Sequence, residues 1–348
     1  MMLNSDVISD ILDRVDGTTL ANAGCVSSDF WSVARQERMW EKACCSMWPS
    51  VQDTDAKNLI SASLGGFRNF YASCFPFVTY ETILSDSICN ELKFKKLCDR
   101  VAVPSDFVLM VDVHYKDKVI FSKVVWGIPA CGDSKGWFCN CPFRIDIINV
   151  DEDHNVTDGV STNVPVGTLK KDEEFWGRFM ENIKLSWIVI NRRTGKAANL
   201  SSRSPLSGKR DWPSDNDFVI CFGSILPVHE ILRCKAVLCK LVMKCRVSDS
   251  DDSSLKVTEL RMVLEDMIGA HVNKRDSLVI LERALACTRT VIYNQTLECY
   301  HKYLSEQIKL REAKMKSEDC LDTLSILSGI VAFASFWSFV FRLSAAIF

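Results

Sequence analysis

The sequence predicts an α+β protein with helical segments at both ends and a central antiparallel, β-sandwich-like domain. Up to about residue 80, apolar side chains recur every three to four positions, as in helices, whereas residues 81–270 alternate apolar and polar side chains, as in half-buried strands. Helical spacing returns after residue 270. We therefore predict five segments: 1–50, 51–80, 81–270, 271–320 and 321–348.

The N-terminal segment carries two apolar series with helical spacing. The first series consists of Val7, Ile8, Ile11, Leu12 and Val15. The second consists of Leu20, Ala23, Val26, Phe30 and Val33. Ser5 and Asp6 are predicted N-caps of the first helix, and Asp16-Gly17-Thr18 is predicted to end it. A helical hairpin of roughly 45 residues buries only a modest part of its surface, so we expect a partner or a neighbouring domain to cover it.

Residues 26–40 carry a compact series with characteristic spacing: Val26, Ser27, Ser28, Phe30, Val33, Ala34, Met39 and Trp40. This spacing resembles the F-box motif. Leu3-Asn4 stands where the family usually has Leu-Pro, and Ser28 stands where it has Lys. Residues 40–50 resemble an extension found in one group of plant F-box proteins. An ordinary helical hairpin packed on the rest of the chain remains the alternative.

The resemblance implies a non-catalytic substrate receptor of a Skp-cullin-F-box ubiquitin ligase. Such a subunit binds a Skp-type adaptor, and through it a cullin, and presents an unknown target protein in the cytoplasm or nucleus. The residues that the resemblance assigns to adaptor docking are Leu3, Val7, Ile8, Ile11, Leu12, Leu20, Val26, Phe30, Trp31 and Trp40. An aspartate at Ile11 or Leu12 is expected to weaken adaptor binding, because a carboxylate would be desolvated without a partner.

The middle of the chain predicts one further helical stretch and several strands. Residues 53–80 have helical spacing that is interrupted at Gly65-Gly66. Residues 111–121 predict a β-hairpin that turns at 116–118. Further strands are predicted at 143–147, 185–190, 218–222 and 239–247. A bulge near Thr258-Glu259 would reconcile the opposite parities of the apolar residues on either side of it.

Composition and motifs argue against catalysis and nucleic-acid binding. A net charge of -2 gives no basic face for nucleic acid, and the five histidines form no recognised catalytic pattern. Cys131, Cys139 and Cys141 lack zinc-site spacing. Without a signal peptide, we expect the sixteen cysteines to be reduced. We predict no catalytic, cofactor-binding or metal-binding residue.

Two tryptophans are candidates for target binding. Trp137 and Trp212 are flanked by polar and turn-forming residues, which favours the surface, whereas most of the other tryptophans are expected in the core. A faint similarity of residues 185–202 to the phloem-lectin sandwich keeps a carbohydrate- or ligand-binding module open as an alternative function.

The chain turns helical again near its C-terminus and then becomes uncharged. Residues 276–287 and 297–318 predict helices, and 324–341 is an uncharged run of 18 residues, about 27 Å as a helix. Three alternatives are open for this run: a membrane anchor with the bulk of the chain in the cytosol, a helix docked on the sandwich, or a segment that binds another chain. A membrane-tethered scaffold whose F-box serves only its own turnover is a further alternative function.

Overall fold

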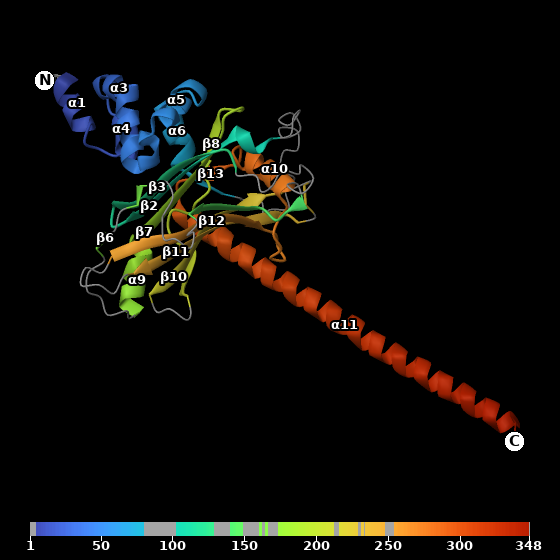
Figure 1. The fold of residues 1–348 in the computed structure, drawn as a ribbon. Coiled ribbons are helices and arrows are strands. Elements are labelled where there is room, and N and C mark those ends of the chain that lie inside the picture. The colour runs from blue at the N-terminus through green and yellow to red at the C-terminus, as the bar shows by residue number, and fades with distance from the viewer. Residues whose placement is uncertain are drawn as a thin grey trace.

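The computed structural model confirms an α+β fold. It describes residues 5–79, 102–128, 140–148, 160–161, 164–165, 173–211, 216–228, 231–232, 234–247 and 254–347. Short N-terminal helices lie against one side of two stacked sheets, and a long helix projects from the body in the opposite direction (Figure 1). Trp137, Trp212 and Leu3 lie outside the described residues.

The N-terminal part consists of short helices. Their bounds are α1 (Ser5–Leu12), α2 (Gly17–Ala23), α3 (Ser28–Ala34), α4 (Glu37–Met47), the 3-10 turn η1 (Pro49–Gln52), α5 (Thr54–Ser63) and α6 (Phe67–Cys74). The interruption predicted at Gly65-Gly66 is confirmed, because both residues have positive φ (73° and 95°) between α5 and α6.

The prediction of one helix across the second apolar series is wrong, since two short helices replace it. Asp16 does not end α1; its carboxylate accepts a hydrogen bond from the Thr19 amide at 2.7 Å and starts α2. Ser27 caps α3 in the same way, accepting from the Phe30 amide at 3.4 Å. Short polar side chains that satisfy the first-turn amides begin a new helix wherever they occur, even inside an apolar series.

Two sheets form the middle of the protein. The first has the order β13-β1-β8-β7-β2-β3-β5, and the second has the order β4-β12-β11-β10-β9, with β6 also paired to β12. The first contains β1 (Phe77–Val78), β2 (Phe107–Tyr115), β3 (Lys118–Trp126), β5 (Val160–Ser161), β7 (Ile183–Asn191), β8 (Lys196–Asn199) and β13 (Arg289–Thr290). The second contains β4 (Arg144–Ile148), β6 (Val164–Pro165), β9 (Ser207–Arg210), β10 (Asp217–Pro227), β11 (Ala236–Val247) and β12 (Ser254–Glu265). The described neighbours are antiparallel except β1 and β8, which are parallel.

Two local predictions in the sheets are confirmed. Lys116 and Asp117 link β2 and β3 with φ of 48° and 61°, the paired left-handed conformations of a type I′ hairpin turn. In β12, Thr258 is the extra residue of a bulge, because its neighbours Val257 and Glu259 pair with consecutive residues of β11. The bulge keeps the apolar residues on both sides of it in the same core.

The main core lies between the two sheets. Val111 and Trp187 from the first sheet meet Phe222 and Leu241 from the second in one buried cluster. Two helices, α9 (Glu173–Asn182) and α10 (Lys274–Ala284), add their own apolar side chains to this cluster. The arrangement is a sandwich, as the alternating apolar pattern of the strands predicts.

The outer face of the first sheet is also buried. Met110 and Ile188 belong to a second cluster that contains Trp48 and Phe70 of the N-terminal helices. Consequently β2 and β7 are apolar on both faces over residues 107–111 and 187–190, which explains the continuous apolar runs there. Residues 5–74 and the first sheet therefore share one hydrophobic core.

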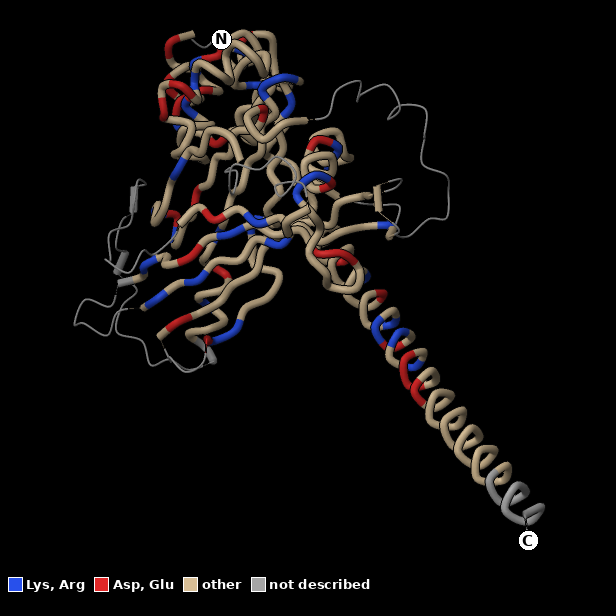
Figure 2. The backbone as a smooth tube through the Cα atoms, turned by 45° about the vertical axis from the view of Figure 1, so that its right-hand side comes forward, with Lys and Arg blue, Asp and Glu red and all other residues tan. Residues whose placement is uncertain are grey.

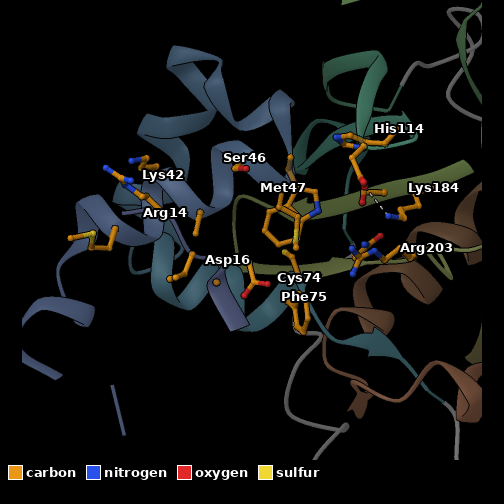
Figure 3. Close-up of a pocket in the computed structure, with 18 of the residues that line it drawn as sticks. Arg14, Asp16, Lys42, Ser46, Met47, Cys74, Phe75, His114, Lys184 and Arg203 are labelled. Atoms are coloured by element: carbon orange, nitrogen blue, oxygen red, sulfur yellow. Dashed lines mark hydrogen bonds and ion pairs between the residues drawn. The ribbon is translucent and has the colours of Figure 1, made fainter. Parts of the chain in front are cut away.

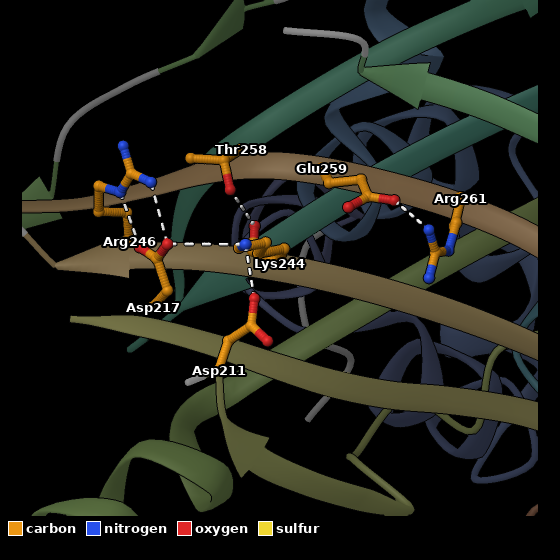
Figure 4. A network of polar contacts seen from close by, with 7 residues as sticks. All are labelled: Asp211, Asp217, Lys244, Arg246, Thr258, Glu259 and Arg261. Atoms are coloured by element: carbon orange, nitrogen blue, oxygen red, sulfur yellow. Dashed lines mark hydrogen bonds and ion pairs between the residues drawn. The ribbon is translucent and has the colours of Figure 1, made fainter. Parts of the chain in front are cut away.

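Charged side chains occupy part of the outer face of the second sheet (Figure 4). Arg246 donates two hydrogen bonds to the carboxylate of Asp217, at 2.7 and 2.9 Å. Lys244 lies 2.6 Å from Asp211 and 3.6 Å from Asp217. Asp217 is buried. The hydrogen bonds from Arg246 hold the pKa of its carboxyl below the usual value.

We expect Asp217→Asn to lower the free energy of unfolding by about 1–2 kcal/mol near neutral pH, because the partly buried charge-assisted bonds to Arg246 are lost and solvent screens the exposed guanidinium. A lowered pKa contributes stability above the unfolded value of 3.8, and this contribution disappears as pH falls through the native value. The difference between wild type and variant in urea unfolding should therefore shrink in acid. Asp117→Asn is the control, since its ion pair with Lys184 is solvent-exposed on the aspartate side and should change stability by less than about 1 kcal/mol. An equal loss at neutral and acid pH would contradict this account.

The last helix, α11 (Tyr293–Ile347), is continuous over 55 residues. It merges the two helical stretches predicted at 297–318 and 324–341. By length and composition it is able to cross a membrane. Residues 324–339 are exposed throughout, so the alternative in which this run docks on the sandwich is wrong.

Candidate functional site

The structure divides the residues predicted for adaptor docking into two groups. Four are buried inside the helical module: Ile8, Leu12, Leu20 and Trp40. Four are exposed, namely Val7 (45%), Ile11 (47%), Val26 (72%) and Trp31 (48%), while Phe30 is half-buried. The exposed group forms the candidate docking surface, and the buried group positions it.

Helix α1 shows how this division arises. Ile8 and Leu12 are four residues apart and point into the cluster that also contains Val33 of α3. Val7 and Ile11 precede them by one position each, so they lie about 100° around the helix and face solvent. The exposed pair is therefore a second apolar stripe, which burial inside this chain does not require.

The exposed Trp31 on α3 is held by its neighbours in the sequence. The guanidinium of Arg35 lies 4.6 Å from the centre of the Trp31 ring, close enough for a cation–π contact. Behind it, the buried Trp40 donates its ring N–H to the carbonyl of Ala34 at 2.7 Å, which fixes α4 to the end of α3. Trp31 thus offers a large apolar ring at the surface of an ordered helix.

The segment after α4 joins the helical module to the sheet through aromatic side chains. The Trp48 ring lies 5.5 Å from Phe70 and 5.6 Å from Tyr71, measured between ring centres. Trp40 lies 5.3 Å from the same Tyr71. This is the extension at residues 40–50 that the sequence singled out, and its tryptophans act as core residues.

A buried carboxylate forms the polar part of the contact between residues 48–52 and the first sheet, which we call the joint. Asp112, on the outer face of β2, accepts hydrogen bonds from the Ser50 amide at 2.8 Å, the Ser50 hydroxyl at 2.6 Å and the Ser122 hydroxyl at 2.7 Å. Burial raises the pKa of Asp112 to about 6. The alternation of apolar and polar residues in this strand gives no indication of this role for Asp112. The available signal was Met110, an apolar residue two positions away on the same face.

A cavity of about 450 Å³ lies beside this joint (Figure 3). Its lining includes Arg14 and Lys42 from the helices and His114, Lys184 and Arg203 from the sheet side. Lys42 pairs with Asp13 at 3.2 Å, and Lys184 with Asp117 at 2.9 Å. Burial, together with the charges of Lys184 and Arg203, lowers the pKa of His114. Of the predicted docking residues that the structure describes, only Leu12 lines this cavity.

The cysteines act as core residues rather than as ligands wherever they are deeply buried. Burial raises the pKa of the thiols of Cys44, Cys74, Cys239 and Cys245, so they stay protonated at neutral pH. Within the described ranges, no group of three or more His, Cys, Asp or Glu side chains is arranged to hold a metal ion. Cys131 and Cys139 lie outside those ranges.

Comparison with known proteins assigns the chain to a family. No family model and no solved structure matches it. The Arabidopsis thaliana F-box protein At2g27310 is 31% identical over 97% of this chain and 95% of its own length, and the Arabidopsis F-box protein At3g44326 is 30% identical over 90% of this chain and 82% of its own. The rice F-box protein GID2 (Oryza sativa subsp. japonica) is 37% identical over 20% of this chain and 34% of its own length. Similarity at this level along nearly the whole chain shows that the protein belongs to the F-box family.

Proposed function

We propose that this chain is the substrate-recognition subunit of a Skp-cullin-F-box ubiquitin ligase. It binds a Skp-type adaptor through α1, α2 and α3 and presents a target protein to the ligase. The observation that carries this proposal is the exposure of four large apolar side chains of an F-box protein: Val7 and Ile11 on α1, Val26 in the link between α2 and α3, and Trp31 on α3. Large apolar side chains clustered on such a small module mark a protein-binding surface.

The two groups of docking residues have different roles in this proposal. The exposed side chains and the half-buried Phe30 contact the adaptor, and Leu3 adds to them from the segment that precedes α1. Ile8, Leu12, Leu20 and Trp40 act as positioning residues, since they are buried and set the orientation of the helices. A docking surface with ordered aromatic and aliphatic anchors loses little conformational entropy when it binds.

The receptor itself performs no bond chemistry. It raises the effective concentration of target lysines near the charged ubiquitin-conjugating enzyme, which requires that target and adaptor be held in a fixed relative position. The core shared by the helices and the first sheet, together with the bonds between Asp112 and Ser50, supports such a fixed relation. In this proposal the chain consists of five segments with boundaries at residues 50, 80, 270 and 320. Trp137 and Trp212 are the candidate contacts with the target.

Proximity labelling with the full chain tests the proposal. With the proteasome inhibited, wild type is expected to label an adaptor, a cullin and ubiquitinated target proteins. Trp31→Ala should lose most of the adaptor and cullin labelling, because truncating a central aromatic anchor typically costs about 2 kcal/mol or more, roughly 30-fold in affinity. It should still label the targets. Unchanged adaptor labelling by the variant, or ubiquitination of this chain alone in wild type, would refute a receptor function.

A further inference from the structure

We infer that residues 324–341 of α11 cross a lipid bilayer and that the preceding part of the same helix is a stalk holding the protein off the cytosolic surface. If the chain is a ligase receptor as proposed, its targets are proteins of that same membrane, and this part of the inference rests on the proposed function. This inference is carried by the burial, composition and hydrogen bonding of α11.

Helix α11 leaves the body of the protein after its first turns. Tyr303 is fully buried against β10 and β11, and Gln307 is 8% exposed. From residue 308 to residue 339 every side chain is exposed. Figure 2 shows that charged residues mark the first part of the projecting helix and that uncharged residues follow without interruption. The helix thus has a polar section next to the body and an apolar section beyond it.

The apolar section is apolar on all sides. Its large side chains are between 45% and 65% exposed: Leu324, Ile326, Leu327, Ile330, Val331, Phe333, Phe336, Trp337 and Phe339. At about 100° per residue these positions are spread around the whole helix and do not form a single stripe. A protein partner that covered one face would leave the others in water. A bilayer covers all of them at once, so lipid is the occupant that fits.

Two hydroxyl groups in this part of the helix are satisfied by the helix itself. Ser328 donates its hydroxyl hydrogen bond to the carbonyl of Ser325 at 2.8 Å, and Thr323 donates to the carbonyl of Asp319 at 2.8 Å. Such bonds let serine and threonine enter hydrocarbon without an unpaired donor. Ser328 is therefore compatible with a membrane span.

Length and flanking charge fit one orientation. The uncharged run measures about 27 Å as a helix, against roughly 30 Å of bilayer hydrocarbon. Lys309, Arg311, Lys314 and Lys316 precede it, whereas Arg342 follows it closely. An excess of basic residues before the span places that side in the cytosol. A core helix of a soluble protein would be buried, which this run is not.

The polar section is suited to be a stalk in water. Lys309 pairs with Glu306 at 2.7 Å, and Lys314 lies 3.8 Å from Glu318, one turn away on the same face. Residues 308–323 span about 24 Å as a helix. The N-terminal helices lie on the far side of the sandwich from the projecting end of α11 (Figure 1). The adaptor surface would thus face the cytosol, and the sandwich would lie within reach of cytosolic segments of membrane proteins.

Extraction of the full-length protein from cell membranes tests the tether. Wild type is expected in the pellet after washing with alkaline carbonate. In the double variant Ile330→Lys/Phe333→Lys, called the run variant, the pelleted fraction should fall at least about 10-fold, because two charges at the centre of the run oppose insertion. The matched control Leu310→Lys/Met315→Lys adds the same charges to exposed apolar positions of the stalk and should stay in the pellet. Release of the wild-type protein by carbonate would overturn the membrane tether, and so would retention of the run variant in the pellet. A wild-type protein that is a soluble oligomer, where the run variant is a monomer, would also overturn it.

Two further measurements separate this inference from the proposed function. Co-purification with the Skp-type adaptor should be equal in wild type and in the run variant. If neither protein binds the adaptor, the receptor function is rejected and the membrane tether is unaffected. Proximity labelling should lose membrane proteins from the labelled set of the run variant. An unchanged set of labelled targets would reject the membrane target class.

Discussion

Substituting Ile11 with aspartate is expected to abolish binding of a Skp-type adaptor while leaving the fold intact. Ile11 is 47% exposed and lies one helical turn from the exposed Val7. In the free protein the new carboxylate stays in water, but in the complex it would be desolvated against apolar groups without a partner, at a cost of several kcal/mol. We expect affinity to fall by roughly 100-fold or more in a direct binding measurement with purified components.

Two variants control for this prediction. Ile268→Asp introduces the same change at an equally exposed isoleucine (50%) in the turn between β12 and α10, and should leave adaptor affinity unchanged. Leu12→Asp places the carboxylate in the buried core of the helical module and should unfold that module. In this variant, loss of adaptor binding would therefore coincide with loss of the helical circular dichroism signal. If the Ile11→Asp variant is folded and binds the adaptor with wild-type affinity, Ile11 is not part of the adaptor-docking surface.

Replacing Asp112 with alanine is expected to loosen the joint between the helices and the first sheet. The Ser50 amide and hydroxyl would lose their acceptor inside a buried contact. A buried donor without a partner costs about 1–3 kcal/mol, so we expect the free energy of unfolding to fall by roughly 2–6 kcal/mol for the two groups together. Urea unfolding measures this loss, and hydrogen exchange should show faster opening at the η1 amides. Unchanged exchange at η1 would contradict the role of Asp112 in the joint.

The pH dependence at Asp112 has a defined sign. Its native pKa of about 6 is above the unfolded value of 3.8, so the native state holds the proton more tightly in this range. Stability therefore falls as pH rises from 3.8 to about 6, by roughly 3 kcal/mol for a shift of this size. Asp112→Asn keeps the shape without the charge and should lack this slope. The same slope in wild type and variant would exclude Asp112 as its source.

Local features of the fold could be predicted from the sequence because they depend on neighbouring residues. The turn at Lys116-Asp117 follows from consecutive charged residues between two apolar series, and the bulge at Thr258 follows from an alternation pattern that changes parity within a few residues. The break between α2 and α3 was missed because apolar spacing continues across it, while the capping bond of Ser27 decides where the helix begins. Apolar periodicity alone therefore predicts which segments are helical more reliably than where each helix starts.

Long-range features required the structure. The parallel contact of β1 and β8 pairs Phe77 with Asn199, and no local pattern indicates that these residues meet. Likewise, the stripe on α1 identifies apolar residues without saying that Ile8 faces the core and Ile11 the solvent, because both fall within one broad apolar arc. The polar joint at Asp112 depends on η1 packing over β2, which brings together residues 62 positions apart.

The central claim is that the exposed apolar side chains of α1, of α3 and of the link between α2 and α3 are covered by the adaptor. Hydrogen exchange of the full-length protein, measured with and without a saturating Skp-type adaptor, tests it most directly. The account predicts slower exchange of the amides from 5 to 34 on adaptor binding and no change in β10, β11 and β12. Unchanged exchange in residues 5–34, or protection confined to the sandwich, would contradict it.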